Sequence, residues 1–281
     1  MKTVIVTGAS SGIGKAAALR LAKVGCHVLA GVRRPSDADA WKKVPRVTPL
    51  TIDVAKEDSV ERACKEVSEL LSEASEVHLI NNAGIAVAGP VEGVSLARWR
   101  EQFEVNVFGL VRVTQAFLPQ IRRTKGRVVN ISSVSGLATS PYLGPYSASK
   151  FAVEAISDAL RRELRQFGAK VVVVEPGPIA TPIWEKNFAK KDMIVGDLST
   201  EMQKIYGQQL AKFLKGAELS ASTAASVDKV SDVIEKALTL KNPRIRYVVG
   251  TRGLSTQMAV FGVAPDFMID YLIAKSFGKS R

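Results

Sequence analysis

A tyrosine and a lysine stand four residues apart in the sequence Tyr-Ser-Ala-Ser-Lys at residues 146–150. On a helix, this spacing places Tyr146 and Lys150 on one face, where an ammonium group favours the ionised form of a nearby phenol. The pKa of Tyr146 is therefore expected to fall toward the working range, although one lysine is not expected to supply the whole shift. Such a tyrosine can act as general acid or base in interconverting a ketone and an alcohol. Many ordinary tyrosine–lysine pairs on protein surfaces have the same spacing, so the spacing alone does not identify an active site.

Ser133 lies upstream of this pair and directly follows Arg127–Ser132, a run that predicts a strand. The ligand crevice of an open parallel sheet lies at the carboxyl ends of its strands, so a hydroxyl there can hydrogen-bond a substrate oxygen. Ser132 is expected on the other face of the strand. The alternative role of Ser133 is to cap the next turn.

A glycine-rich sequence, Thr-Gly-Ala-Ser-Ser-Gly-Ile-Gly at residues 7–14, joins the first predicted strand to the first predicted helix. Glycines let the backbone approach a pyrophosphate, and a helix N-terminus offers free N–H groups and partial positive charge. The spacing differs from G-x-G-x-x-G, and a plain glycine turn is the alternative. The residues expected to bind the phosphates are Gly8, Ser10, Ser11, Gly12, Ile13 and Gly14.

The second predicted strand ends at Arg33 and Arg34, where many dinucleotide-binding chains carry a carboxylate that binds the ribose 2′-hydroxyl. Arginine at this point can instead bind a 2′-phosphate. We therefore expect NADP(H) to be favoured over NAD(H). Asp37 and Asp39 follow closely, and an ordinary solvated arginine pair is the alternative.

Strand-like and helix-like patterns alternate along the chain, and Val171–Val174 is typical of a strand buried on both faces. This predicts an α/β, Rossmann-type doubly wound sheet of about seven parallel strands with helices on both faces. The helical stretch Leu96–Leu118 is expected to end at Pro119. The predicted strands are Val4–Thr7, His27–Val32, Val47–Ile52, Val77–Asn81, Arg127–Ser132, Lys170–Glu175 and Arg246–Val249. The other predicted helices are Gly12–Val24, Asp58–Leu71, Ser147–Phe167, Leu198–Leu214 and Asp228–Leu240.

The composition is that of an ordinary globular protein: 281 residues, of which 46% are hydrophobic and 23% charged. We expect one Rossmann-type domain over residues 1–281, with a substrate-binding loop at about 180–225 and a C-terminal extension at about 251–281. Cys26 and Cys64 lie in no metal or redox spacing, so neither a disulfide framework nor a metal site is expected.

The net charge of +12 is spread along the chain rather than gathered into a basic block, which argues against nucleic-acid binding. No signal peptide and no run of 18 apolar residues is visible, which predicts a cytoplasmic protein.

Taken together, these motifs resemble the classical short-chain dehydrogenase/reductase family, and within it the hydroxysteroid and retinol dehydrogenase branch. The resemblance is strong over about residues 1–190 and weaker over 226–250. It rests on the glycine-rich sequence 7–14, Asn-Asn-Ala-Gly at 81–84, Asn106, Ser133, Tyr146 with Lys150, and Pro176-Gly177.

The resemblance implies four catalytic roles. Tyr146 would transfer the proton, and Ser133 would position the substrate oxygen. Lys150 would bind the nicotinamide ribose and lower the pKa of Tyr146. Asn106 would join a water-mediated proton relay through Lys150, although it could also serve only to bond backbone.

The resemblance also implies how the cofactor is bound. The adenine would contact Asp53 and Val54. The residues that would line the rest of the cleft are Asn82, Ala83, Gly84, Pro176, Gly177, Ile179 and Thr181, with Ile179 and Thr181 at the carboxamide. Ser11 stands where many NADP-preferring members carry a basic residue, which leaves Arg33 as the main determinant of cofactor preference.

Apolar side chains in and near the 180–225 segment predict a pocket for a hydrophobic steroid-like, retinoid-like or other apolar ketone or alcohol. They are Val87, Leu137, Leu143, Ile183, Trp184, Phe188, Met193, Ile194, Met202, Ile205, Tyr206 and Phe213. Core packing is the alternative. Two other functions stay open: reduction of a polar or carrier-bound carbonyl, and non-catalytic sensing of NADP(H).

The apolar residues within 257–278 leave three uses open for the C-terminal tail: peripheral contact with a membrane, closure over the substrate, or a subunit contact. The resemblance implies a homodimer or homotetramer built through the helices at 96–118 and 147–167.

Overall fold

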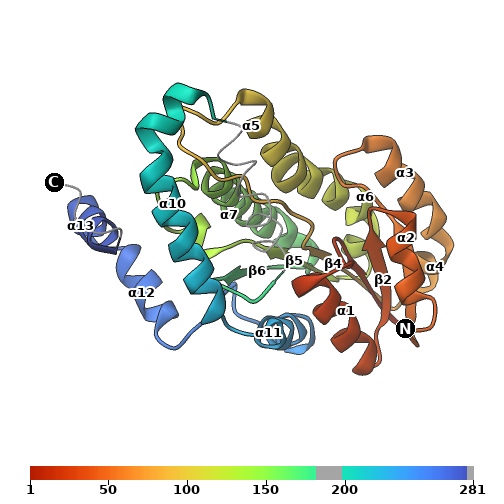
Figure 1. Ribbon diagram of the computed structural model, residues 1–281. Helices are drawn as coiled ribbons and strands as arrows, with labels where there is room; N and C mark the ends of the chain where they lie inside the picture. Colours follow the sequence, from red (N-terminus) through yellow and green to blue (C-terminus); the bar gives the residue numbers. More distant parts are fainter. Residues whose placement is uncertain (182–197, 277–281) are drawn as a thin grey trace.

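The computed structural model describes residues 1–181 and 198–276. Its centre is a seven-stranded sheet with every pair of neighbouring strands parallel, in the order β3-β2-β1-β4-β5-β6-β7 (Figure 1). The strands are β1 Lys2–Val6, β2 His27–Val32, β3 Val47–Thr51, β4 Glu76–Asn81, β5 Arg127–Ile131, β6 Lys170–Pro176 and β7 Arg246–Val249. The predicted fold class is confirmed.

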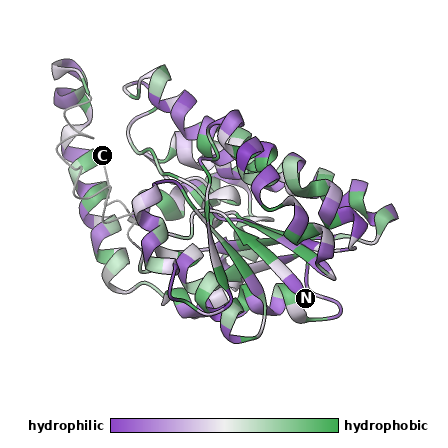
Figure 2. Ribbon diagram, turned by 90° about the vertical axis from the view of Figure 1, so that its right-hand side faces the viewer, coloured by the Kyte–Doolittle hydropathy of each residue, from purple (hydrophilic) through white to green (hydrophobic). Residues whose placement is uncertain are grey.

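Helices cover both faces of this sheet. On one face α1 (Gly12–Lys23) packs against α11 (Val227–Thr239). On the other face α3 (Glu57–Glu66), α6 (Gly109–Arg123) and α7 (Gly144–Leu164) contribute to a second apolar core. The strands between the two helical layers are predominantly hydrophobic in Figure 2, as expected for a sheet buried on both faces.

The order of the strands reverses between β1 and β4, because the chain first adds β2 and β3 on one side and then β4 to β7 on the other. In open sheets of this kind, ligands bind at the carboxyl ends of the strands beside that switch point. The fold therefore brings the glycine-rich turn after β1 and the segments after β4 and β5 to one edge of the sheet.

The prediction that one helix ends at Pro119 is wrong. The helix α5 (Leu96–Phe103) passes through a π-helical turn, Glu104–Phe108, into α6, and Pro119 lies inside α6. A proline lacks only its own N–H donor, so a helix held by packing can continue through it. Val113, Phe117 and Ile121 of α6 are fully buried.

Three other segments differ from their predicted boundaries. The predicted helix Asp58–Leu71 is divided at Val67 into α3 and α4 (Ser68–Glu73). The helix predicted at Leu198–Leu214, within the region expected to be a substrate-binding loop, is present as α10 but is longer and spans Thr200–Ser222. A short helix, α2 (Pro35–Ala38), follows β2.

The C-terminal extension forms two helices, α12 (Leu254–Phe261) and α13 (Asp266–Ser276), which reach away from the sheet at the left edge of Figure 1. Met258 is buried, but several of their large apolar side chains are exposed, and Phe267 is 72% exposed. Within the described residues, the helices are too short or too polar to cross a bilayer.

Candidate active site

Ser133, Tyr146 and Lys150 meet at the carboxyl end of β5. Ser133 follows β5, and α7 begins two residues before Tyr146, so the helix presents Tyr146 and Lys150 toward the strand end. Tyr146 and Ser133 are joined by a side-chain hydrogen bond. The Ser133 hydroxyl also faces the Pro176 carbonyl at 3.4 Å and accepts from the Ser135 N–H at 3.1 Å. Ser133 thus lies at the strand end where a site residue was expected, and it also caps the turn that follows β5.

The expected fall in the pKa of Tyr146 is not found in the protein alone. Burial raises the pKa of this phenol, and the hydrogen bond to Ser133 only partly offsets that effect. The Lys150 ammonium lies over the face of the tyrosine ring, 5.8 Å from its centroid.

Lys150 is itself nearly enclosed, with 7% of the residue exposed, and its Nζ donates to the Ile131 carbonyl at 2.8 Å. Burial lowers its pKa from 10.5 to about 8, against the opposing effect of Glu154. The ammonium therefore titrates close enough to neutrality for its environment to decide its charge.

Asn106 lies in the π-helical turn and is 2% exposed. Its Oδ1 accepts from the Ile85 N–H at 2.9 Å, and its Nδ2 donates to the Ile85 carbonyl at 3.0 Å and to the Ser149 hydroxyl at 3.1 Å. These contacts match the backbone-bonding alternative. They attach the segment after β4 to α7 next to Tyr146.

Gln102 is a site residue that sequence reasoning missed. It lies one turn before Asn106, is fully buried, accepts from the Val87 N–H at 2.7 Å and donates to the Ile85 carbonyl at 2.9 Å. Its amide also approaches Ser149, whose hydroxyl donates to the Tyr146 carbonyl at 2.7 Å. The sequence signal was two amide side chains four residues apart on an amphipathic helix.

The glycine-rich turn is closely packed against the segment after β4. A Cβ on Gly14 would come within 2.4 Å of the Gly8 carbonyl oxygen and of the Asn82 amide nitrogen. Gly8 and Gly12 have φ values of 66° and 56°, a conformation that favours glycine. The turn after β1 thus has a tight backbone with little side-chain bulk at the start of α1, as a pyrophosphate site requires.

Asn82 and Thr7 hold this turn together. The Asn82 amide donates to the Thr7 carbonyl at 2.9 Å and to the Gly8 carbonyl at 3.1 Å, while the Thr7 hydroxyl accepts from the N–H groups of Asn82 and Ala83. The side chain of Asn82 therefore braces the loop expected to bind the phosphates. Gly84 lies against Asn106.

The two arginines after β2 have different surroundings. The Arg34 guanidinium makes a bidentate ion pair with Asp37 at 3.1 and 3.0 Å, which raises its pKa. Arg33 is exposed, and within residues 1–181 and 198–276 its side chain makes no hydrogen bond or ion pair. Of the two, Arg33 is thus available to an anion.

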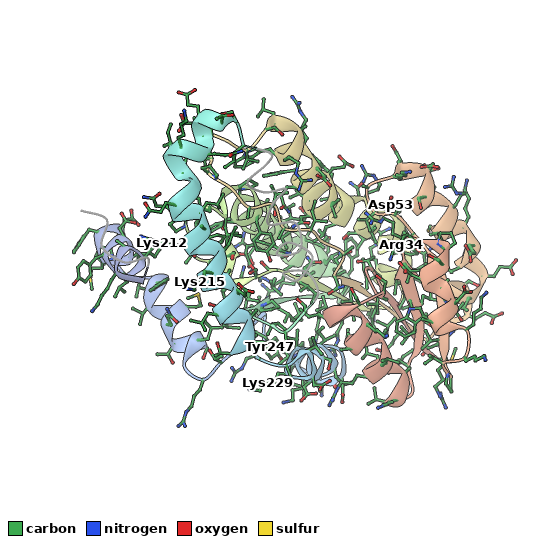
Figure 3. All side chains as sticks on the ribbon, in the orientation of Figure 1. Arg34, Asp53, Lys212, Lys215, Lys229 and Tyr247 are labelled. Atoms are coloured by element: carbon green, nitrogen blue, oxygen red, sulfur yellow. The ribbon has the colours of Figure 1, made fainter. Side chains whose placement is uncertain are left out.

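Asp53 and Val54 follow β3, whose end adjoins that of β2 through the Ile52 N–H, which donates to the Val32 carbonyl at 2.9 Å. This pairing brings Asp53 near Arg34, as Figure 3 shows. The Asp53 Oδ1 accepts from the Ala55 N–H, and the Val54 carbonyl accepts from Arg112. Both residues are thus fixed at the edge where the adenine was expected.

Pro176 and Gly177 continue β6, and the Gly177 N–H donates to the Val249 carbonyl at 2.8 Å. Ile179 pairs with Ala225 in an isolated parallel bridge and is buried, as is Thr181. The segment therefore leaves the sheet beside Ser133.

Several residues of the expected substrate pocket gather in a third apolar cluster around α10. Leu143 and Phe213 are buried in it, Met202 packs against it, and the Tyr142 ring lies 5.6 Å from that of Phe213. Val87 is buried and Leu137 partly buried. Ile205 faces away, with 52% exposed, and the Tyr206 hydroxyl donates to Glu92. The expected pocket residues Ile183, Trp184, Phe188, Met193 and Ile194 lie outside the described residues.

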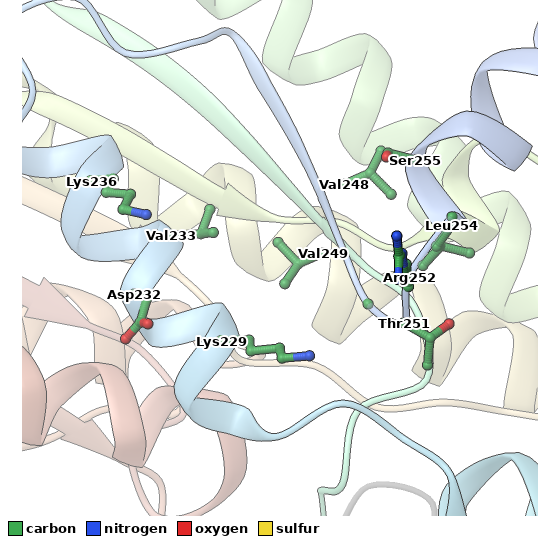
Figure 4. Close-up of a pocket in the computed structure, with 12 residues that line it drawn as sticks. Lys229, Asp232, Val233, Lys236, Val248, Val249, Thr251, Arg252, Leu254 and Ser255 are labelled. Atoms are coloured by element: carbon green, nitrogen blue, oxygen red, sulfur yellow. The ribbon is translucent and has the colours of Figure 1, made fainter.

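A separate hollow lies between α11, the end of β7 and the start of α12 (Figure 4). Its basic side chains are Lys229, Lys236 and Arg252, accompanied by Asp232. None of the predicted site residues lines it.

The short chain dehydrogenase family model matches residues 2–192. The chain is 38% identical to the NADPH-dependent 3-dehydrocapnine reductase of Ornithobacterium rhinotracheale, over 99% of this chain and 98% of that protein. It is 35% identical to retinol dehydrogenase 16 of Mus musculus, over 97% of this chain and 87% of that protein.

Among solved structures, a short-chain dehydrogenase from Streptomyces avermitilis superposes with a TM-score of 0.72 at 27% identity, covering 98% of this chain and 94% of that one. The relatives confirm the expected likeness to the retinol dehydrogenase side of the family. The chain belongs to the short-chain dehydrogenase family and is an oxidoreductase of the type that binds a nicotinamide cofactor.

Proposed function

We propose that this protein is an NADP(H)-dependent oxidoreductase that interconverts a hydroxyl and a carbonyl on a hydrophobic small molecule, with Tyr146 as general acid and base. The observation that carries the proposal is the convergence of Ser133, Tyr146 and Lys150 at one strand end. Beside it, the tight glycine turn at the start of α1 suits a dinucleotide phosphate.

The preference for NADP(H) is supported by Arg33. It is exposed and unpaired among the described residues at the end of β2, where a 2′-phosphate would lie, whereas Arg34 is bound to Asp37. The 3-dehydrocapnine reductase relative is named as NADPH-dependent, which agrees with this assignment.

When bound, the nicotinamide would supply or accept the hydride. The chain's own residues handle the proton. In reduction, the Tyr146 hydroxyl donates its proton to the carbonyl oxygen that the Ser133 hydroxyl positions, and the Lys150 ammonium stabilises the resulting phenolate. Because burial raises the pKa of Tyr146, the phenol is protonated at neutral pH, which suits it to act as an acid.

A hydrophobic substrate is supported by the apolar cluster between α10 and the segment before α7. Leu143, Phe213 and Met202 bring aliphatic, aromatic and thioether groups together beside the start of α7. Pockets of this composition bind apolar ligands. The relative named retinol dehydrogenase 16 guides the choice of the first test compound.

The test is a panel of retinoid, steroid, aliphatic and sugar carbonyls, with NADPH or NADH, followed by the change in nicotinamide absorbance. We expect NADPH-dependent reduction of an apolar carbonyl, and a loss of at least about 1000-fold in kcat in Tyr146→Phe, because the proton donor is removed. Tyr142→Phe, at a neighbouring ring outside the triad, is the matched control. If Tyr146→Phe is as active as the unmodified protein, the proposal that Tyr146 transfers the proton is refuted. Turnover confined to sugars would refute the proposal of a hydrophobic substrate.

A further inference from the structure

Behind the Ser133–Tyr146–Lys150 triad lies a buried cluster of charges that the proposed mechanism does not use. Glu154 and Asp158 follow Lys150 at successive turns of α7, and Glu175 lies at the end of β6 just before Pro176. Arg246 opens β7 and reaches all three carboxylates. Its Nε lies 3.1 Å from Glu154 and 3.4 Å from Glu175, and its Nη2 lies 3.0 Å from Asp158.

The two buried carboxylates of the cluster, those of Glu154 and Glu175, face the one guanidinium of Arg246. The side chains of Glu175 and Glu154 are only 2% and 11% exposed. Among the described residues, Oε1 of Glu154 and Oε1 of Glu175 accept no hydrogen bond. Two carboxylates that face one guanidinium in a buried site favour retention of a proton by one of them. Accordingly, burial and the neighbouring Glu154 raise the pKa of Glu175 from 4.5 to about 7, against the effect of Arg246.

The other groups around the cluster do not neutralise it. From α7, Arg161 contacts Asp158 at 3.2 Å, on the more exposed side. From β5, the Ser132 hydroxyl is buried without a hydrogen bond among the described residues. Lys150 donates to the Ile131 carbonyl rather than to a carboxylate. The charge of Glu154 therefore acts on Lys150 through space.

Glu154 connects this pair to the triad. It lies one helical turn beyond Lys150, and its charge opposes the lowering of the lysine pKa that burial causes. Glu175 is bonded to Pro176, whose carbonyl the Ser133 hydroxyl faces. Glu154 thus places the buried pair of carboxylates next to the group that is proposed to stabilise the tyrosine phenolate.

We propose that Glu154 and Glu175 are positioning residues, that the buried pair keeps a proton on Glu175, and that the release of this proton keeps Lys150 charged as the pH rises. The proton passes to solvent beside Arg246, whose side chain is 35% exposed. The inference deepens the proposed function and rests on it, because it extends the pH range over which the triad can work.

The test compares Glu175→Gln and Glu154→Gln with the unmodified full-length protein, using all-trans-retinal and NADPH as probes. Above neutral pH, Glu175→Gln lacks a negative charge, so Lys150 loses its proton at lower pH. We expect kcat/KM at about pH 9 to fall about three- to tenfold in Glu175→Gln and further in Glu154→Gln. At about pH 6, Glu175→Gln should match the unmodified protein, since Glu175 is already protonated there.

Asp158→Asn is the matched control. It lies on the same helix and contacts the same arginine, but it is more exposed and lies two turns from Lys150. Its pH profile should stay close to that of the unmodified protein. An equal shift in Asp158→Asn and Glu154→Gln would show a general effect of surface charge and overturn the proposal.

A second measurement needs no turnover. Isotope-labelled lysine, with the Lys150 signal assigned through Lys150→Arg, allows the charge of Lys150 to be titrated by NMR. The midpoint should move to lower pH in both Gln variants, and identical midpoints in all proteins would refute the inference. If the unmodified protein does not reduce retinal, that result counts against the proposed substrate class, while the lysine titration still decides this proposal.

Thermal unfolding provides an independent check that folded Glu175 holds a proton. Because the pKa of Glu175 is raised in the folded protein, the folded chain binds this proton more tightly than the unfolded chain does. The resulting stabilisation is lost as the pH rises from about 4.5 to about 7. Glu175→Gln should lack this part of the fall in Tm, and its amide oxygen can face Arg246 as the carboxylate does. A fall of the same size in both proteins would exclude proton uptake at Glu175.

Discussion

Arg33 and Arg34 show how adjacent residues of one type can have different surroundings. Asp37 lies three residues after Arg34, in α2, and accepts from Nε and Nη2 of its guanidinium. Arg33 is exposed and has no such partner among the described residues. A guanidinium already paired with a carboxylate must give up that partner before it can bind a phosphate, whereas an unpaired one loses only water.

At the residue scale we therefore predict that Arg33→Ala weakens NADPH binding about 10- to 100-fold, because charge-assisted hydrogen bonds contribute about 1.5–3 kcal/mol. NADH affinity should stay within about twofold, since it has no 2′-phosphate. Fluorescence titration with both cofactors measures this, with Arg34→Ala as the matched control and a smaller effect expected there. A parallel loss of NADH and NADPH affinity would contradict the assignment.

At the scale of the elements, α5 and the π-helical turn that follows it each contribute one amide that bonds to the segment after β4. Gln102 and Asn106 together satisfy backbone groups of Ile85 and the N–H of Val87. Backbone polar groups that leave a strand inside the protein need such partners, because burying them unpaired is costly. The helix thereby fixes both the exit of β4 and the start of α7.

We predict that Gln102→Leu lowers the free energy of unfolding by about 2–4 kcal/mol, because the Val87 N–H and the Ile85 carbonyl lose a partner in a buried place. Urea unfolding checks this, and Arg100→Ala, an exposed position on the same helix, should change stability by less than about 0.5 kcal/mol. A loss below about 1 kcal/mol in Gln102→Leu would mean that water or a shifted backbone replaces the amide.

At the scale of the whole molecule, large apolar side chains remain uncovered on the helices α5 to α7. Phe108 is 55% exposed and Phe151 45% exposed, and Leu96 is 68% exposed. They lie on the helices through which the family resemblance implies a subunit contact. Apolar side chains in such a position favour association between copies of the chain.

We accordingly predict that the protein is a homodimer or homotetramer and that the pair Phe108→Asp and Phe151→Asp shifts it to a smaller species. Burying a carboxylate in an apolar contact is too costly for the assembly to persist. Light scattering after size-exclusion chromatography measures the mass, with Val24→Asp, another exposed apolar position, as the control. An unmodified protein that stays monomeric at high concentration would contradict this prediction.

The sequence by itself predicted the alternation of strands and helices, the parallel sheet, and the place of Ser133, Tyr146 and Lys150 within it. These follow from local rules: continuous apolar runs predict strands buried on both faces, and a spacing of four places two side chains on one helical face. The chemistry of the triad could be inferred for the same reason, because its members are near one another in the chain or at the end of a predicted strand.

Which groups each side chain contacts could be determined only from the tertiary structure. It showed that Pro119 lies within α6, since the packing of the surrounding helix outweighs the loss of one donor. It placed the Lys150 ammonium over the Tyr146 ring, and it buried the phenol, which raises the pKa of Tyr146. It also brought Arg246 to Glu154 and Glu175, which are 92 and 71 residues away in the chain. Contacts over such separations depend on how the layers pack, and no local pattern encodes them.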